Sequence, residues 1–171
     1  MKTKLILLSF FVLLIIGCKE NNSIVEPNND QQVLDKSVST YTSDSYLIDG
    51  SIGGKINVEY NWKNAHGEKS KVIAELKIPK NAFSGIKEFS MIFNLSKFSV
   101  DLFPSPTTFD KPIILNLKYK NINVLDKDLD FKYLDGNEVV VYDENIVDLE
   151  NGTLEVKKAR LNHFSEWGWG R

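Results

Sequence analysis

Apolar and polar residues alternate with a period of two along most of this chain after residue 54. Successive side chains of an extended strand point to opposite faces, so the alternation predicts strands with one apolar and one solvated face. No stretch beyond residue 18 keeps a helical period for ten residues. The alternation predicts strands over residues 55–62, 71–78, 89–95, 113–119, 129–133 and 139–141.

Turn-forming residues separate these segments. Glycine and asparagine accept the positive φ angles of tight turns, and aspartate often begins them. We therefore expect an all-β fold, an antiparallel β-sandwich that forms a single domain over residues 45–171. That range is long enough for one core and too short for two. The turns are predicted at His66-Gly67, Asn81 to Gly85, Asp135-Gly136-Asn137 and Asn151-Gly152.

The N-terminal residues have the pattern of a bacterial lipoprotein signal. An apolar run from Leu5 to Ile16 follows two lysines and is too short to span a bilayer. Gly17 supplies the small residue before a cleavage site, and Cys18, the only cysteine in the chain, follows it. We predict a signal peptide over residues 1–17, cleavage between Gly17 and Cys18, and lipid attachment at Cys18. The alternative is a free cysteine after an ordinary signal peptide.

A lipidated Cys18 makes a membrane the first expected partner. A diacylglycerol anchor buries many methylene groups, each worth about 0.8 kcal/mol, and so holds permanently. Lys19, rather than aspartate, follows the cysteine, which favours sorting to the outer membrane of the bacterial envelope, on its periplasmic or its surface face. Residues 18–44 are polar and poor in aromatic residues, which predicts a disordered tether between the anchor and the domain.

Charge and cysteine usage narrow the class of partner. The formal net charge of the chain is −2, and loss of Lys2 and Lys4 with the signal removes two positive charges and leaves −4. A mildly acidic surface with interspersed charges argues against a nucleic-acid partner. Since the chain has no second cysteine, packing alone has to stabilise the domain in an oxidising compartment.

Two groups of polar residues share some features with metal sites. Residues 126–130 hold three aspartates at alternate positions, as in a calcium loop, but Phe131 takes the place of the required glycine. His66 and Glu68 are better explained as exposed residues of a hairpin turn. We therefore predict no metal and no cofactor. No paired catalytic carboxylates, nucleophile elbow or phosphate loop points to a conventional enzyme.

Four short motifs follow one another along the strand pattern. They are Gly53-Gly54-Lys55-Ile56, then Ile78-Pro79-Lys80-Asn81-Ala82-Phe83, then Phe103-Pro104-Ser105 leading to Phe109-Asp110-Lys111-Pro112-Ile113, and finally His163-Phe164-Ser165. In this order they resemble the ZU-five domain, the β-sandwich module of ankyrins, zonula occludens proteins and netrin receptors, which also occurs in bacterial envelope lipoproteins. The resemblance spans about residues 50–168 and implies the same sandwich that the alternation predicts.

Two positions depart from the family pattern. Asn81 stands where glycine is preferred, and asparagine is the commonest other residue that takes the left-handed conformation such a turn requires. Pro106 stands where a glycine tends to follow the Pro-Ser pair, so we expect a differently shaped loop there. Phe83 and Phe109, which lie near strand-ending prolines, are expected to fill the ends of the core.

The resemblance also implies a chemistry for the triplet His163-Phe164-Ser165. In some animal proteins with this domain, such a triplet cleaves itself through an N-to-O acyl shift and hydrolysis of the resulting ester. Carried over, Ser165 is the nucleophile, His163 the base and the Phe164 carbonyl the electrophile. The reaction requires a strained peptide bond and an oxyanion donor that faces the Phe164 oxygen. The alternative is a structural triplet, in which Phe164 is buried and Ser165 bonds the backbone at a strand edge.

The last residues of the chain contain a candidate binding surface. Trp167 and Trp169 are separated by one glycine, so both point to the same side of an extended segment. Such a pair could stack on sugar rings or dock on a partner. The alternative is that Trp167 completes the core and Trp169 caps the end of the sandwich.

Three functions fit these patterns. The expected partner beyond the membrane is an unknown protein or glycan. The leading interpretation is a non-enzymatic envelope lipoprotein whose sandwich serves in protein-protein interaction or envelope architecture. The second is a carbohydrate-binding envelope lipoprotein, which requires exposed tryptophans in a flat strip. The third is a self-cleaving domain, which requires a strained bond between Phe164 and Ser165 and a polar partner for His163.

Overall fold

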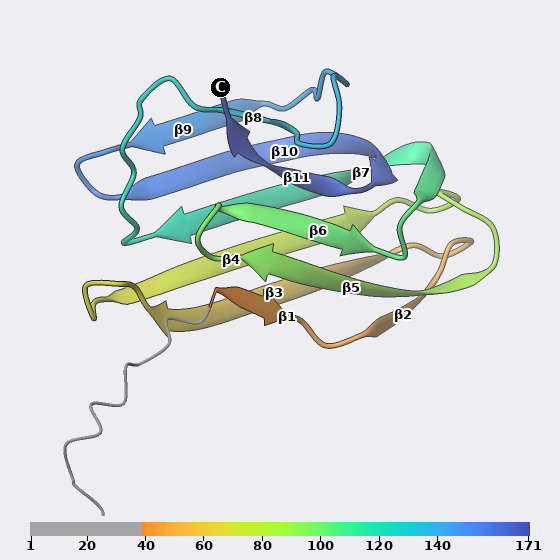
Figure 1. The fold of residues 1–171 in the computed structure, drawn as a ribbon. Coiled ribbons are helices and arrows are strands. Elements are labelled where there is room, and N and C mark those ends of the chain that lie inside the picture. Colours follow the sequence, from red (N-terminus) through yellow and green to blue (C-terminus); the bar gives the residue numbers. More distant parts are fainter. Residues whose placement is uncertain (1–38) are drawn as a thin grey trace, which may run out of the picture. The chain divides into compact units, whose positions relative to one another are not determined.

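The computed structural model describes residues 39–171, which form two antiparallel sheets packed face to face (Figure 1). The predicted all-β sandwich is therefore confirmed. The described residues contain no α-helix, and so no helix long enough to cross a membrane. The predicted signal peptide, Gly17, Cys18 and most of the predicted tether lie outside the described residues.

The first sheet consists of β1 (Thr40–Thr42), β2 (Tyr46–Asp49), β5 (Ile86–Asn94), β6 (Ser99–Phe103), β8 (Asp130–Tyr133) and β11 (Glu166–Gly170). Its order is β1-β5-β6-β11-β8, and β2 also pairs with β5. Because β1 and β2 pair with different halves of β5, the two short strands share one edge of the sheet.

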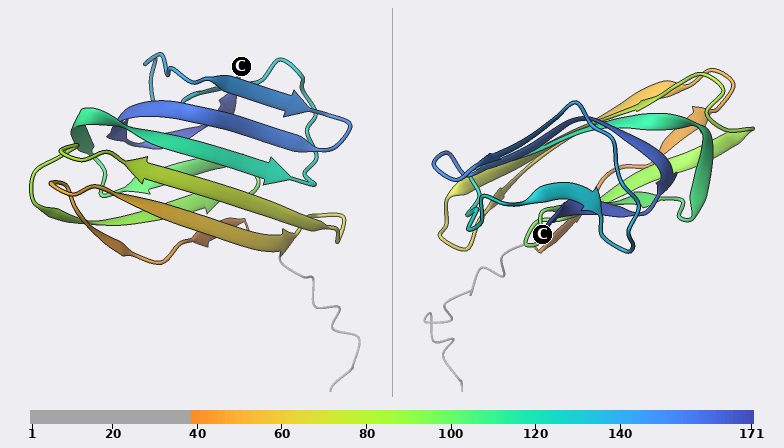
Figure 2. Two further views of the ribbon diagram at one scale, coloured as in Figure 1. Left: turned by 180° about the vertical axis from the view of Figure 1, so that it is seen from behind. Right: turned by 90° about the horizontal axis from the view of Figure 1, so that it is seen from above.

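The second sheet consists of β3 (Gly54–Lys63), β4 (Lys69–Ile78), β7 (Thr107–Lys120), β9 (Glu144–Asp148) and β10 (Thr153–Phe164). Its order is β3-β4-β7-β10-β9, and every neighbouring pair is antiparallel. Figure 2 shows the two layers from behind and from above.

The inner faces of both sheets are apolar and buried, as the alternation predicts. In β3, for example, Ile56, Val58 and Trp62 are buried whereas Lys55 and Asn57 are exposed. Full burial of one such aliphatic or aromatic side chain stabilises the fold by about 1.5–3 kcal/mol. The largest fully buried side chains are Trp167, Tyr119, Phe89, Phe93, Phe131 and Phe164.

An aromatic cluster fills one end of the core. Phe83 lies edge-on to Phe89 with ring centroids 5.3 Å apart, and Phe109 lies edge-on to Phe164 at 4.9 Å. Phe89 and Phe164 are also 4.9 Å apart. Phe83 and Phe109 fill the core as expected, but both lie at the same end rather than at its two ends.

The opposite end of the sandwich, which we call the entry end, holds the first described residue. There Ser39 lies beside the β3–β4 turn at His66, the β5–β6 turn at Ser96 and Asn123 after β7. The arrowheads of β3, β5 and β7 all point to this end in Figure 1.

The domain begins earlier than residue 45, which corrects the predicted end of the tether. Thr40–Thr42 form β1, and the ring of Tyr41 stacks on that of Tyr60 at 3.8 Å with the planes 6° apart. Ser43 is buried and accepts a hydrogen bond from the Met91 backbone N–H at 3.0 Å. The ring of Tyr41 thus joins β1 to the core. The sequence around Tyr41 is polar and does not indicate this contact, because its partner Tyr60 lies in the distant strand β3.

The predicted strand over residues 139–141 is wrong. Val139 is 85% exposed and Val141 54% exposed, whereas Val140 between them is buried. Only Val141 makes a β-bridge, to Arg160, and the strand β9 begins later, at Glu144. These valines lie in the connection from the first sheet to the second. The path of that connection determines which of the three side chains points into the core.

The tight turns follow the predicted backbone chemistry. Asn81 has a φ of 61°, the left-handed conformation expected where the family prefers glycine. The hairpins at Gly67 and Gly152 also have positive φ, of 77° and 57°. In the loop with the unusual Pro106, both the Phe103-Pro104 and the Ser105-Pro106 peptide bonds are cis.

Candidate functional site

The His163-Phe164-Ser165 triplet lies where the chain crosses from one sheet to the other. Phe164 ends β10 in the second sheet and Glu166 begins β11 in the first, so Ser165 alone forms the bend between them. The side chain of Phe164 is 1% exposed and belongs to the aromatic cluster. This burial of Phe164 is what we expect if the triplet is structural rather than self-cleaving.

His163 has a carboxylate partner that the sequence did not suggest. Its Nε2 lies 2.7 Å from Oε2 of Glu138, and the side chain of His163 is 19% exposed. The imidazole ring contacts both Tyr133 and Trp167, with centroids 5.0 and 5.2 Å away. When Nε2–H donates to Glu138, Nδ1 of the neutral ring is unprotonated. Glu138 thus orients the ring.

The carbonyl oxygen of Phe164 faces two polar groups. It accepts a hydrogen bond from Ser105 Oγ at 3.2 Å and lies 3.4 Å from Nδ1 of His163. In the tautomer with the proton on Nδ1, that nitrogen can donate to this oxygen. Both groups would stabilise negative charge on the oxygen.

Ser165, the predicted nucleophile, is not joined to the predicted base. Its carbonyl accepts a hydrogen bond from the Leu102 N–H at 3.2 Å, and no hydrogen bond links its side chain to His163 within residues 39–171. The structure therefore brings His163 to the electrophile rather than to Ser165. Glu138 and Ser105 come from distant loops, and no spacing in the sequence could have indicated them.

Trp167 and Trp169 are both buried, so the prediction that they form an exposed binding surface is wrong. They are 0% and 6% exposed. β11 lies between β6 and β8, and Trp169 packs edge-on against Phe131 at 5.1 Å. The burial of Trp167 confirms the alternative interpretation that it completes the core, and Trp169 is also buried. Because Trp62 is also only 8% exposed, the flat aromatic strip required for sugar stacking is not available on the three tryptophans.

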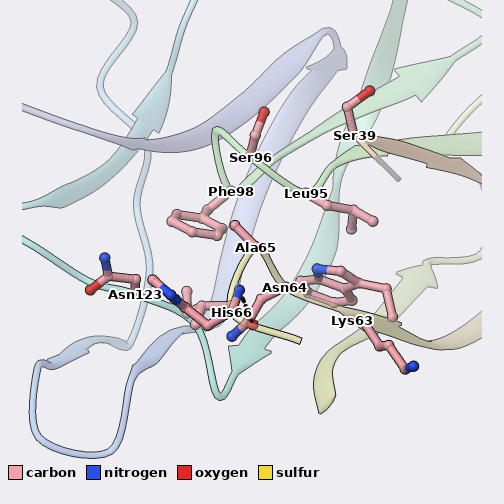
Figure 3. Close-up of a pocket in the computed structure, with 11 residues that line it drawn as sticks. Ser39, Lys63, Asn64, Ala65, His66, Leu95, Ser96, Phe98 and Asn123 are labelled. Atoms are coloured by element: carbon pink, nitrogen blue, oxygen red, sulfur yellow. Dashed lines mark hydrogen bonds between the residues drawn. The ribbon is translucent and has the colours of Figure 1, made fainter. Parts of the chain in front are cut away.

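The entry end contains a small hollow of about 210 Å³ (Figure 3). Its apolar wall includes Trp62, Leu95, Phe98 and Ile122. Polar side chains and backbone from the surrounding turns also line it, namely those of Ser39, Lys63, Asn64, His66, Ser96 and Asn123. The volume suits at most a single small ring.

The carboxylates of the aspartate-rich loop serve separate structural contacts. Asp126 accepts a hydrogen bond from the Asp128 N–H at 2.9 Å and pairs with Arg171, and together these lower its pKa. Asp130 instead accepts a hydrogen bond from the hydroxyl of Tyr142, and this bond raises the pKa of that hydroxyl to about 12. Within the described part of the chain, no group of three His, Cys, Asp or Glu residues could hold a metal ion.

His66 and Glu68 occupy the exposed β3–β4 turn. Asn64 Oδ1 accepts hydrogen bonds from the backbone N–H groups of His66 and Glu68, at 2.9 and 3.0 Å. The expectation that His66 is an exposed turn residue is confirmed.

Comparison with protein-family models, curated proteins and solved structures gave no match to this chain. The resemblance to the ZU-five domain therefore remains a prediction from the motifs.

Proposed function

We propose that this chain is a bacterial envelope lipoprotein whose β-sandwich is an interaction domain, held at the outer membrane by a lipid on Cys18. The observation that carries the proposal is the setting of the sole cysteine, directly after an apolar run and Gly17. The described domain supports it, because residues 39–171 complete a folded sandwich downstream of the anchor position. Packing there involves no cysteine, which leaves Cys18 for modification.

A group of exposed apolar side chains supports an interaction role. Leu47 pairs with Glu88 and Asp49 pairs with Ile86, so Leu47 and Ile86 are diagonal neighbours on the outer face of the first sheet. They are 76% and 67% exposed, and Ile52, in the turn after β2, is 73% exposed. Exposed apolar side chains on neighbouring strands are typical of a surface that another protein covers.

The anchor is tested by the intact mass of the detergent-extracted protein. We expect a chain that begins at Cys18 and carries acyl groups. The variant Cys18→Ala should lose both the added mass and the cleavage after Gly17. An unmodified chain that begins elsewhere would rule out the lipoprotein assignment.

The interaction surface is tested by a photo-crosslinking residue at position 47 in living cells. We expect one discrete adduct, and we expect Ile86→Glu to abolish it while the protein remains folded. A crosslinker at Lys158, an exposed residue of the second sheet, is the matched control and should give no such adduct. Equal crosslinking from both positions would contradict a specific partner at this surface.

Self-cleavage is a second candidate, and the contacts of His163 and Phe164 favour it. Glu138 supplies the polar partner for His163, and Ser105 Oγ lies 3.2 Å from the Phe164 oxygen, where an oxyanion would form. Ser165 Oγ would attack the Phe164 carbonyl carbon, and the hydroxyl proton would pass through solvent to the Ser165 nitrogen. The C–N bond would break as the Ser165 nitrogen gains a proton, and water would then hydrolyse the ester.

A cleaved chain would keep its last strand. β11 pairs with both β6 and β8, and Trp167 within it is fully buried. Cleavage must therefore be measured by mass under denaturing conditions. A chain ending at Phe164, restored to full length by Ser165→Ala, would establish the reaction. A full-length wild-type chain after prolonged incubation would exclude it.

A further inference from the structure

Four lysines lie side by side on the outer face of the second sheet, at the entry end. Lys63 in β3 pairs directly with Lys69 in β4, and Lys71 in β4 pairs directly with Lys120 in β7. Directly paired residues of antiparallel strands point to the same face, with Cβ atoms about 4.5–5.5 Å apart. We call these four residues the lysine cluster.

The lysine cluster is not explained by the stability of the sheet. Like charges directly opposite each other destabilise an antiparallel pair. Lys71 is partly neutralised, since its Nζ lies 2.6 Å from Oε1 of Glu59. Lys63, Lys69 and Lys120 form no ion pair within residues 39–171.

The other charges on this face follow a different arrangement. Lys118 in β7 forms an ion pair of 2.7 Å with Glu155 in β10, and Lys55 pairs with Glu75. Glu68, the acidic residue next to Lys69, accepts a hydrogen bond from Asn64 at 3.1 Å. At the far end of this face Lys55 also pairs directly with Lys77, beside Glu75. The entry end differs because two adjacent direct pairs bring four lysines together there, and three of these form no ion pair within the described residues.

The position of the cluster relates it to the proposed anchor. Ser39, the first described residue, and Lys63 line the same hollow at the entry end. Only 21 peptide units separate Cys18 from Ser39, and even a fully extended chain of that length spans at most about 75 Å. A lipid on Cys18 would keep Ser39, at the end of the sandwich that holds the cluster, within that distance of the bilayer surface.

We propose that the lysine cluster docks the sandwich, entry end first, on anionic phospholipid headgroups of the membrane that holds the lipidated Cys18. This inference rests on the proposed lipid anchor. Lysine ammonium groups bind phosphate as point charges, and basic groups near an anionic surface are attracted to it within a Debye length. If cleavage before Cys18 removes Lys2 and Lys4, the mature chain has a net charge of −4. The chain as a whole is then repelled by an anionic surface, so any attraction to it comes from the cluster alone. The anchor supplies the affinity, and the cluster sets the orientation.

The test is lysine footprinting of the full lipidated chain. The protein is reconstituted in vesicles of phosphatidylcholine alone or with about 30% phosphatidylglycerol, and the rate of lysine acylation is measured by peptide mass spectrometry. We expect Lys63, Lys69 and Lys120 to react about threefold more slowly on the anionic vesicles. Lys77, which lies on the same face of β4 at the far end, should react at the same rate on both. Molar salt should remove the difference.

A charge reversal provides the matched control. In Lys69→Glu, the protection of Lys63 and Lys120 should be lost, whereas in Lys77→Glu it should persist. Both changes reverse one exposed charge on the same face of β4, so general effects on net charge are equal.

The outcomes separate this inference from the proposed function. Equal reactivity of the cluster on both kinds of vesicle, in a chain that is acylated and sediments with them, would overturn the docking while the anchor stands. Equal protection on neutral vesicles would also overturn it, because headgroup charge would then have no part. A chain that carries no lipid and does not sediment with either vesicle would refute the anchor itself.

Discussion

The indole nitrogen of Trp169 donates a hydrogen bond of 2.8 Å to Oδ1 of Asn145. Trp169 lies in β11 of the first sheet and Asn145 in β9 of the second, so the bond joins the two layers. The side-chain nitrogen of Asn145 donates to the Leu129 carbonyl, next to β8, at 3.0 Å. One amide of the second sheet thus satisfies two polar groups on the side of the first sheet, where β8 and β9 end the sandwich.

Loss of this amide should destabilise the domain. Asn145→Leu leaves the Trp169 N–H and the Leu129 carbonyl without their partner, which costs about 1–3 kcal/mol where such groups are buried. Urea denaturation followed by tryptophan fluorescence measures the change. Asn57→Leu, on the exposed outer face of β3, is the control and should alter the free energy of unfolding by less than about 0.5 kcal/mol. Equal effects would show that the inter-sheet bonds contribute nothing.

The aromatic cluster should be the most sensitive part of the core. Phe164→Ala removes a ring that is 1% exposed and contacts both Phe89 and Phe109, so we expect a loss of about 3–5 kcal/mol of unfolding free energy. Leu47→Ala, at a side chain 76% exposed, should cost less than about 0.5 kcal/mol. Calorimetry of both variants checks the ranking, and a small effect at Phe164 would contradict the described packing.

Two glycines with nearly the same φ should respond differently to alanine. Gly53 has a φ of +80°, and a Cβ there would lie 2.5 Å from the Ile78 carbonyl oxygen. Gly67 has a φ of +77°, with no atom within 4 Å of the same position. Gly67→Ala should lower the free energy of unfolding by about 1–2 kcal/mol, the cost of placing alanine in the left-handed conformation. Gly53→Ala should lower it by clearly more, because the neighbouring backbone must also move. Chemical denaturation of the pair compares them, and equal costs would argue against the close approach at Gly53.

Stability should fall in strong alkali through the tyrosine hydroxyls. Burial raises the pKa of Tyr119 well above its ordinary value of 10.0, and its hydroxyl donates to the Ser99 carbonyl at 2.7 Å. Above pH 10 the unfolded chain releases this proton while the folded chain retains it, so the unfolded state binds fewer protons and stability decreases as pH rises. The same holds for Tyr142 between pH 10 and about 12.

The variant Tyr119→Phe tests this linkage. It loses one hydrogen bond at every pH, but its unfolding free energy should decline less steeply above pH 10 than that of the wild type. Urea titrations at pH 8, 10 and 11 provide the slopes. A parallel decline in both proteins would show that Tyr119 does not carry the alkaline transition.

The strands and their buried faces could be predicted from the sequence because both depend on local order. Side chains in an extended chain alternate faces, so the residues between Lys55 and Trp62 reveal an inner and an outer face wherever the strand is placed. Asn81 could be assigned a left-handed conformation for a similar reason, because the φ angle that the turn requires is a property of that one residue. The same local logic failed at Val139 and Val141, where the path between two sheets, not the alternation, sets which side chain points inward.

Contacts between distant segments were decided only by the tertiary structure. The burial of Trp167 follows from the insertion of β11 between β6 and β8, and nothing near Trp167 in the sequence determines that order. The partnership of His163 with Glu138 and the pairing of Lys63 with Lys69 likewise depend on which segments meet and in which register. Composition and periodicity are properties of one strand, whereas strand order and register are properties of the assembled sheets. For that reason the class of fold and its apolar faces follow from local residue order, whereas the polar groups that face one another depend on how the sheets pack.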